Sequence, residues 1–305
     1  MPKIMANSLS VWNFCIHSYL LNMFTQTPLP NTPRHTLVQL TQIPIPLHSC
    51  LPQLESYRTY PVVTTHPDSQ EPLMNALAAG LPGRSIYAET DGWNAPYHQP
   101  IPGAPNGVWV RKTVLEKLER INQRLAEIGL ELYLLDGFRT IQCQQGIYNW
   151  MKATTEKAYP YYSQQQVKEH LRNFISDPSN FNPLDSTTWT SHITGGAIDL
   201  TLRHKASATL LEMGGVFDDP SPISFTSYYE NLELPQAHSA THAEARRNRR
   251  LLYHMMRTEH FTSLPAEWWH FDFGDQLWAR NNAHYTDEFS NQQHTAFYGP
   301  AQLKE

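Results

Sequence analysis

Apolar residues recur at helical spacing in the middle third of the chain, which is its clearest periodic signal. The recurring positions are three and four residues apart: Val114, Leu118, Ile121, Leu125 and Ile128. Charged residues fill the positions between them. Because this spacing puts the apolar side chains on one face, it predicts an amphipathic helix, which ends at Gly129.

Three shorter segments have the pattern of strands. Residues 131–135 form a short apolar run, residues 197–202 alternate, and residues 267–273 are rich in aromatic side chains. Two further helices are predicted over 167–175 and 243–258. Helices and strands are mixed without a regular alternation, which favours an α+β domain over a doubly wound parallel sheet.

The N-terminal part of the chain lacks the regular pattern seen further along. Residues 1–54 contain scattered prolines among Thr, Gln and Asn without a sustained period, which predicts a loosely ordered N-terminal extension. We expect a single domain over residues 55–305. Residues 141–190 are predicted to form a long, partly helical connection, and long connections in compact domains often cover functional sites.

Composition narrows the class of protein. The chain has 305 residues, of which 40% are hydrophobic and 17% charged, with a formal net charge of -5. This balance is typical of a globular protein and argues against a nucleic-acid partner, which usually binds a basic surface. The arginine-rich run over 246–250 is interpreted as a solvated or internally paired helix face.

No targeting or membrane segment is predicted. The chain contains no run of 18 apolar residues, so we expect no transmembrane helix. Polar residues interrupt the apolar stretch over 11–24, which disfavours a secretory signal peptide. The expected location is therefore the cytoplasm, with the periplasm as the alternative, and the sequence leaves the oligomeric state open.

The cysteines restrict the kinds of metal site. Cys15, Cys50 and Cys143 are far apart and form no CxxC pair, so neither a disulfide framework nor a thiolate zinc site is implied. Any metal site must be built from histidines and carboxylates, both of which suit zinc.

Such a set is available in two segments. A hydrolytic zinc ion needs three protein ligands and an open position for water. His192, Asp199 and His270 can supply the ligands, and the glycines between the first two let the chain turn back on itself. Glu267, three residues before His270, can take a proton from the water. Arg139, at the end of a predicted strand, can stabilise an oxyanion.

The strand pattern complicates this reading. Residues three apart on an ideal strand point to opposite faces, so Glu267 and His270 cannot share a site on a regular strand. We expect Glu267 to lie in the turn after Pro265, before the strand begins. On chemistry and spacing alone, a structural histidine beside a glycine turn and an aromatic core strand remain open alternatives to a zinc site.

The motifs resemble those of a known family. Residues 190–199, TSHITGGAID, resemble the SxHxxGxAxD motif of the zinc D-Ala-D-Ala peptidases, and EWWH over 267–270 resembles their ExWH motif. DGFR over 136–139 and MGGVFD over 213–218 are similar to segments of the D-alanyl-D-alanine dipeptidase branch, which includes the vancomycin-resistance dipeptidases. The likeness runs from about Tyr87 to Ala279 in the same order.

This resemblance implies a fold, a cofactor and an activity. The fold is one compact α+β domain with a central antiparallel sheet flanked by helices, as in the D,D-peptidases and Hedgehog-like domains. The implied activity is hydrolysis of the small dipeptide D-Ala-D-Ala to two D-alanines, with one Zn²⁺ per chain. The residues that carry it by resemblance are the ligands His192, Asp199 and His270, the base Glu267 and the transition-state residue Arg139.

The resemblance also implies substrate contacts. Asp218 matches a position that pairs with the substrate ammonium, and Tyr87 and Thr190 match positions that line the dipeptide pocket. Two residues depart from the family pattern: Thr140 stands where the family has proline, and Thr190 stands where it has serine. We expect the first to affect only loop rigidity, and the second to affect binding of the substrate carboxylate.

Two alternatives remain. A D,D-carboxypeptidase that trims peptidoglycan peptides would use the same zinc chemistry in a more open cleft, and Asp218 with the 141–190 connection argues against it. A non-catalytic zinc-binding domain is a different class of function. The presence of both Glu267 and Arg139 argues against it, as does the preference of structural zinc sites for four protein ligands.

Overall fold

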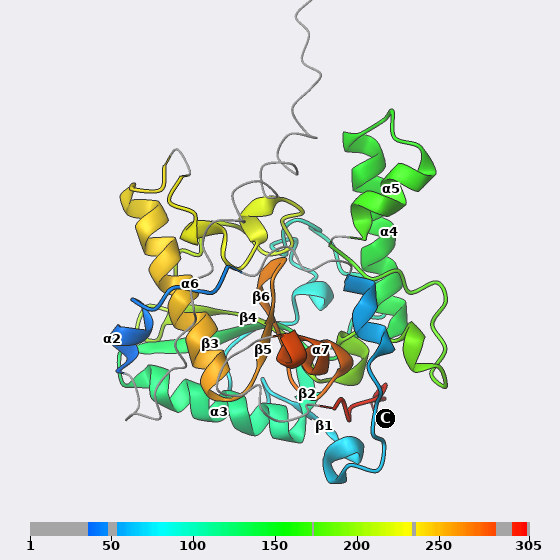
Figure 1. The fold of residues 1–305 in the computed structure, drawn as a ribbon, viewed down its shortest axis with the longest axis horizontal. Helices are drawn as coiled ribbons and strands as arrows, with labels where there is room; N and C mark the ends of the chain where they lie inside the picture. Colours follow the sequence, from blue (N-terminus) through cyan, green and yellow to red (C-terminus); the bar gives the residue numbers. More distant parts are fainter. Residues whose placement is uncertain (1–35, 48–53, 173, 234–235, 285–294, 304–305) are drawn as a thin grey trace, which may run out of the picture.

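The centre of the protein is an antiparallel sheet of four strands in the order β3-β4-β6-β5 (Figure 1). The computed structural model describes residues 36–47, 54–172, 174–233, 236–284 and 295–303. The strands of this sheet are β3 (Leu130–Asp136), β4 (Ala197–His204), β5 (Thr262–Leu264) and β6 (Glu267–Asp272). A separate antiparallel pair consists of β1 (Leu73–Asn75) and β2 (Trp109–Arg111). The α+β class and the antiparallel sheet are thus confirmed.

The two long strands are buried on both faces. Leu132 and Leu134 of β3, and Ile198, Leu200 and Leu202 of β4, have no measurable exposure. Double burial explains why the apolar residues of β3 form a continuous run instead of alternating with polar ones. The strand positions predicted from the sequence are all confirmed within one or two residues.

Helix α3 (Lys112–Ala126) carries four of the five predicted stripe positions, whereas the fifth, Ile128, lies beyond the end of the helix and is 42% exposed. Val114, Leu118, Ile121 and Leu125 are completely buried, and the helix packs against β3. The chain leaves the helix through Gly129, whose φ of 72° lies in the left-handed region that favours glycine. The apolar stripe therefore positions β3 directly behind the helix.

Helix α6 (Ala240–Thr258) covers β4, β5 and β6 and uses its arginines internally. Arg249 is 2% exposed and donates to the carbonyl oxygens of Met213, Ile223 and Phe225. Arg250 forms an ion pair with Glu230. The predicted internal pairing of this run is confirmed for both arginines, and Arg249 fastens the 213–225 loop to the helix.

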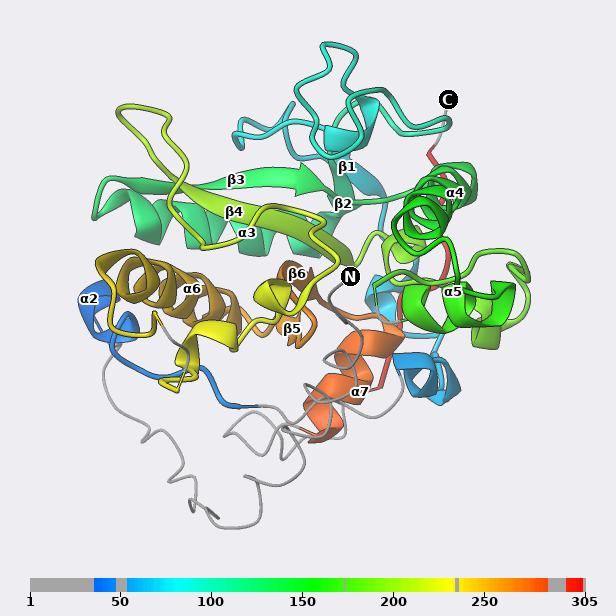
Figure 2. The same ribbon diagram turned by 90° about the horizontal axis from the view of Figure 1, so that it is seen from above.

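Helices α4 (Ile141–Ala158) and α5 (Gln164–Leu171) pack together at one end of the molecule, opposite α6 (Figures 1 and 2). They occupy most of the predicted connection, and α5 begins and ends earlier than the predicted 167–175. Thr140 is the N-cap of α4: its hydroxyl accepts from the amide of Cys143 and donates to the Gly103 carbonyl. The threonine that departs from the family pattern thus does more than alter loop rigidity, since it starts a helix.

Part of the expected N-terminal extension packs on the domain. Helix α2 (Leu37–Leu40) contacts α6, and Leu37, Leu40 and Ile45 are buried. Residues 1–35 and 48–53 lie outside the described residues, so the domain boundary stays a prediction. Helix α7 (Gln276–His284) packs against β5 and against the 3-10 helix Leu54–Thr59. Within the described ranges, no helix is long and apolar enough to cross a membrane.

Candidate metal centre and active site

Strand register brings three ionisable side chains into one row across the sheet. Asp136 at the end of β3 pairs with Asp199 of β4, and Asp199 pairs with His270 of β6. An irregularity between Leu134 and Asp136 shifts the β3 register at this point. Directly opposed residues on antiparallel strands have neighbouring side chains. Three segments far apart in the sequence therefore meet at one spot.

His192 reaches the same spot from the turn that precedes β4. It lies in a single 3-10 turn, His192–Thr194, followed by Gly195 with a φ of 72°. At Gly196 a side chain would collide with the carbonyl oxygen of Phe273, so the chain can pass β6 only as glycine. The paired glycines fold His192 back over Asp199, as the sequence predicted.

Hydrogen bonds set the orientation of both imidazole rings. Nδ1–H of His192 donates to the Gly137 carbonyl at 2.8 Å, and Nε2–H of His270 donates to Asp272 Oδ1 at 2.8 Å. Each ring therefore turns its other nitrogen inward, and these two nitrogens are 3.2 Å apart. Asp199 completes the group, with Oδ1 3.0 Å from His270 Nδ1 and Oδ2 3.5 Å from His192 Nε2.

This donor set fits a metal ion. The ligand atoms of His192, Asp199 and His270 all lie within 4.8 Å of one another, and all three residues are buried. Burial alone would raise the pKa of Asp199, but the two histidines hold it well below its usual range. Burial opposes a charge on His270, yet Asp272 and Asp199 raise its pKa well above the ordinary value. The site thus attracts a cation between two inward nitrogens and a carboxylate.

Arg139 stands beside this group. Its guanidinium donates to Asp136 Oδ2 at 2.9 Å and to Gln144 Oε1 at 2.8 Å, and its Nη2 is 3.5 Å from Asp199 Oδ2. The residue is 7% exposed, and although burial opposes its charge, Tyr87, Asp136 and Asp199 raise the pKa of the guanidinium above its ordinary value. A fixed cation therefore faces the space next to the ligand atoms.

Glu267 shares the site with His270 because the strand is irregular. In the β5–β6 pairing, Ser263 opposes Phe271 whereas the next residue, Leu264, opposes Glu267. The extra residues on β6 break the two-residue alternation, and Glu267 Oε2 lies 3.9 Å from His270 Nδ1. The turn occupies only Pro265 and Ala266, and β6 already begins at Glu267, so the expected place of Glu267 in the turn is wrong by one residue. Burial raises the pKa of its carboxyl to about 8.

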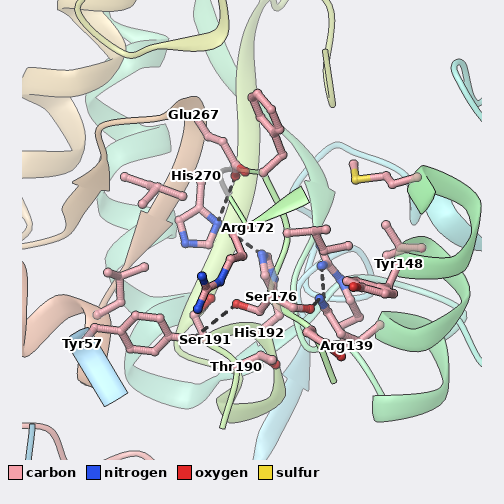
Figure 3. A pocket seen from close by; sticks show the side chains of 18 of the residues that line it. Tyr57, Arg139, Tyr148, Arg172, Ser176, Thr190, Ser191, His192, Glu267 and His270 are labelled. Atoms are coloured by element: carbon pink, nitrogen blue, oxygen red, sulfur yellow. Dashed lines mark hydrogen bonds and ion pairs between the residues drawn. The ribbon is translucent and has the colours of Figure 1, made fainter. Parts of the chain in front are cut away.

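A cavity of about 390 Å³ opens onto these residues (Figure 3). Figure 3 shows Glu267 turned toward His270, with Arg139 on the opposite side of the cavity. Thr190 and Ser191 line it beside His192, and helices α4 and α5 contribute the outer wall. The rim carries basic side chains from Arg58, Lys168 and Arg172.

Asp218 and Tyr87 also line the cavity. The hydroxyl of Tyr87 donates to Asp218 Oδ2 at 2.8 Å. Burial raises the pKa of the Asp218 carboxyl to about 7, and Asp199 adds to this rise. The lining thus includes an acidic side chain at Asp218 and basic side chains from Arg58, Lys168 and Arg172.

Comparison with known proteins places the chain. A family model described as D-Ala-D-Ala dipeptidase, Peptidase_M15, matches residues 74–295. The D-alanyl-D-alanine dipeptidase of Synechocystis is 32% identical over 200 residues, which cover 62% of this chain and 78% of the relative. The enzymes of the same name from Streptomyces coelicolor and Enterococcus faecalis are 25% and 27% identical, each over 67% of this chain and 91% of the relative.

The chain belongs to the D-Ala-D-Ala dipeptidase family. It is therefore an enzyme of the hydrolase class, in a family of zinc peptidases. A solved structure of the vancomycin-resistance D,D-pentapeptidase VanY in complex with Zn(II) is also similar, at 16% identity and a TM-score of 0.32. That likeness covers 64% of this chain and 89% of VanY.

Every site residue predicted from the dipeptidase motifs lines the cavity. These residues are Tyr87, Arg139, Thr190, His192, Asp199, Asp218, Glu267 and His270. Their individual roles remain predictions. The sequence interpretation missed four neighbours that contact them: Tyr97, Asp136, Gln144 and Asp272.

A signal was available for two of the missed residues. Asp136 opens the DGFR segment, and Asp272 follows His270 by two positions, the spacing that keeps two strand residues on one face. Tyr97 and Gln144 carried no such signal, because only the tertiary fold brings them to the site.

Proposed function

We propose that the protein is a zinc-dependent dipeptidase that hydrolyses D-Ala-D-Ala to two D-alanines. The observation that supports this most directly is the pair of inward nitrogens of His192 and His270, 3.2 Å apart and closed by Asp199 inside a cavity. One zinc ion held by these three side chains would supply Lewis-acid activation of a water molecule and of the scissile carbonyl.

Glu267 is the proton carrier in this proposal. Its carboxylate takes the proton of the attacking water at Oε2 and then passes it to the nitrogen of the leaving D-alanine. Enclosure by protein raises its pKa to about 8, and a carboxyl with a pKa near the working pH can both accept and release a proton.

Arg139 stabilises the negative oxygen that forms on the attacked carbonyl. Its guanidinium is fixed in advance by Asp136 and Gln144, so it needs no reorganisation when charge develops. Gln144 belongs to α4, which ties this residue to the helices that close the cavity.

The charged side chains that line the cavity suit a free dipeptide. Asp218 pairs with the substrate ammonium, since an enclosed ammonium without an anionic partner would be costly. Thr190 and the basic rim face the substrate carboxylate. Pairing at both ends favours a short zwitterion over the end of a longer peptide, whose nitrogen at this position is an uncharged amide.

A non-catalytic zinc site is disfavoured by the donor set. Among the residues that the structure describes, no fourth histidine, cysteine or acidic residue joins the three ligand atoms. Structural zinc sites are closed by four protein ligands, whereas catalytic ones leave a position open. Glu267 and Arg139 also line the space that an open position would face.

The test compares wild-type protein with Glu267→Ala. Bound zinc is quantified after dialysis, and free D-alanine is measured with D-Ala-D-Ala, L-Ala-L-Ala and a pentapeptide ending in D-Ala-D-Ala. We expect one zinc per chain in both proteins, D-alanine release from the D,D-dipeptide by wild type, and a loss of about 10²- to 10⁴-fold in the variant. Comparable cleavage of the pentapeptide would favour a carboxypeptidase, and zinc binding without cleavage would refute the proposed substrate.

A further inference from the structure

Asp218 is held in an uncommon backbone conformation. Its φ of 59° lies in the left-handed region, where residues other than glycine are rare, although aspartate is among those that tolerate it. Such a conformation persists when the surroundings fix it. Arg249 holds the same loop by donating hydrogen bonds to the carbonyl oxygens of Met213, Ile223 and Phe225.

Two tyrosines fix the side chain of Asp218. The hydroxyls of Tyr87 and Tyr97 both donate to Oδ2, each at 2.8 Å. Tyr97 is 4% exposed, and its ring packs edge-on against Tyr87 and at a tilt of 56° against Trp150 of α4, with centroids 5.4 and 4.5 Å away. The position of the Tyr97 hydroxyl is therefore set by packing on both sides of the ring.

Both donors use the same carboxylate oxygen. Asp218 lines the cavity and is only half-buried, so part of it faces that space. With Oδ2 occupied by two hydroxyl groups, Oδ1 is the oxygen available to a ligand in the cavity. Two donors to one carboxylate also favour its ionised form, which is the form that pairs with an ammonium group.

The two tyrosines differ in one contact. Tyr87 accepts from Arg139 Nη2 at 3.3 Å, and the guanidinium lies 4.8 Å from the centre of its ring. No hydrogen bond joins Tyr97 to Arg139 in the part of the chain that the structure describes. Tyr87 thus connects Asp218 to Arg139, whereas among the described residues Tyr97 is hydrogen-bonded to Asp218 but not to Arg139.

We propose that Tyr97 is a positioning residue for Asp218, and that it makes the enzyme selective for substrates with a free amino terminus. This inference rests on the proposed function. Tyr97 acts on recognition of the ammonium through Oδ2 of Asp218. Tyr87 acts both on recognition of the ammonium and on Arg139. Removing each hydroxyl in turn therefore distinguishes an effect on binding alone from an effect on binding and catalysis.

The kinetic test compares Tyr97→Phe with Tyr87→Phe on D-Ala-D-Ala. Each substitution removes one hydroxyl that bonds the same oxygen at the same distance and keeps the packed ring. For Tyr97→Phe we expect KM to rise about tenfold with kcat within about twofold of wild type. For Tyr87→Phe we expect a similar rise in KM together with a fall in kcat.

Tyr229→Phe is the matched control. Tyr229 is also buried, and its hydroxyl donates to the carbonyl of Gly214 in the loop that carries Asp218. Removing it weakens the loop without touching the carboxylate. We therefore expect a lower melting temperature and unchanged KM, which separates a structural effect on the loop from the positioning effect.

A binding test addresses amino-terminus selectivity directly. D-Ala-D-Ala and N-acetyl-D-Ala-D-Ala are titrated calorimetrically into the zinc-loaded Glu267→Ala protein, with and without Tyr97→Phe. We expect the preference for the free amine to fall about tenfold when the Tyr97 hydroxyl is removed. Equal loss of affinity for both ligands, or a fall in kcat at unchanged KM, would overturn the role assigned to Tyr97.

The two proposals can fail separately. If wild type releases no D-alanine but the free amine still binds better in a Tyr97-dependent way, the proposed reaction fails and the inference stands. If wild type is active and Tyr97→Phe keeps the full preference for the free amine, the inference fails and the proposed reaction stands.

Discussion

The metal end of the cavity, defined by His192, Asp199 and His270, and the Asp218 end, defined by Asp218 with Tyr87 and Tyr97, are built in different ways. At the metal end, Asp199 and His270 are direct partners on adjacent strands, so backbone pairing sets their separation. At the Asp218 end, the carboxylate lies on a loop, and side-chain contacts from Tyr87 and Tyr97 set its position. Strand pairing gives a rigid site for chemistry, whereas loops held by side chains can be altered one contact at a time.

The largest expected effect comes from removing a ligand at the strand-built end. In His270→Ala the inward nitrogen 3.0 Å from Asp199 is lost, so we expect zinc retention after dialysis and D-alanine release both to fall to background. Metal analysis and the D-alanine assay measure this. His204→Ala, an exposed histidine at the far end of β4, is the matched control and should behave as wild type. Full zinc occupancy in His270→Ala would disprove the assigned ligand set.

The next effect tests whether the strand-built end needs its own supporting contact. Asp272 is fully buried and accepts from His270 Nε2, and thereby keeps Nδ1 turned inward. In Asp272→Asn we expect zinc affinity to fall about 10- to 100-fold, because the outer partner orients a ligating histidine. Competition with a chromogenic chelator measures the affinity. An unchanged affinity would mean that strand pairing alone orients the ring.

A third change affects only the loop-built end. In Asp218→Asn the ammonium partner becomes neutral while the three ligands stay in place, so we expect zinc content to be unchanged and KM for D-Ala-D-Ala to rise about 10- to 100-fold. Steady-state kinetics with zinc-loaded protein measures it. Loss of zinc in this variant would show that the two ends are not independent.

The smallest expected effect comes from His254, which lies outside the metal end and the Asp218 end of the cavity. It tests how acid destabilises the fold independently of metal loss. His254 of α6 is 8% exposed and donates from Nε2 to the carbonyl of Ile43. Burial lowers the pKa of its imidazole to about 4, below that of the unfolded chain. Between these two values the unfolded state binds the extra proton, so stability falls as the pH drops from about 6.5 toward 4.

The measurement is urea unfolding of the metal-free protein at pH 7 and pH 5, compared with His254→Gln. We expect wild type to lose about 2 kcal/mol more than the variant over this interval. Because the zinc ligands are the same in both proteins, the difference isolates His254. Equal losses in the two proteins would show that the zinc ligands and other groups dominate the acid response.

The sequence predicted elements best where one local pattern was strong. The stripe of Val114, Leu118, Ile121 and Leu125 is buried on α3 as predicted, because a spacing of three and four residues is a property of the chain itself. Helix α4 lacked such a clear stripe and was only part of a broad partly helical prediction. Its start depends on the Thr140 cap, which bonds to Gly103 across the fold.

Site prediction followed the same division. The motif residues from Arg139 to His270 line one cavity, as their resemblance to the family motifs predicted. The prediction for Glu267 was off by one residue, because a single strand cannot reveal the irregular pairing of β5 with β6. Tyr97 was missed because nothing near it in the sequence indicates Asp218 as its partner.

By itself, the sequence determined which side chains are available for zinc chemistry, where the strongly patterned elements α3, β3, β4 and β6 lie, and which family the chain resembles. Only the tertiary structure decided that Asp136, Asp199 and His270 stand in one row, which imidazole nitrogens face inward, and that two tyrosines share one oxygen of Asp218. The physical reason is the sequence separation over which each kind of interaction acts. Propensity and periodicity act between neighbours along the chain, whereas strand register and hydrogen-bond partners are settled by contacts between residues far apart in it.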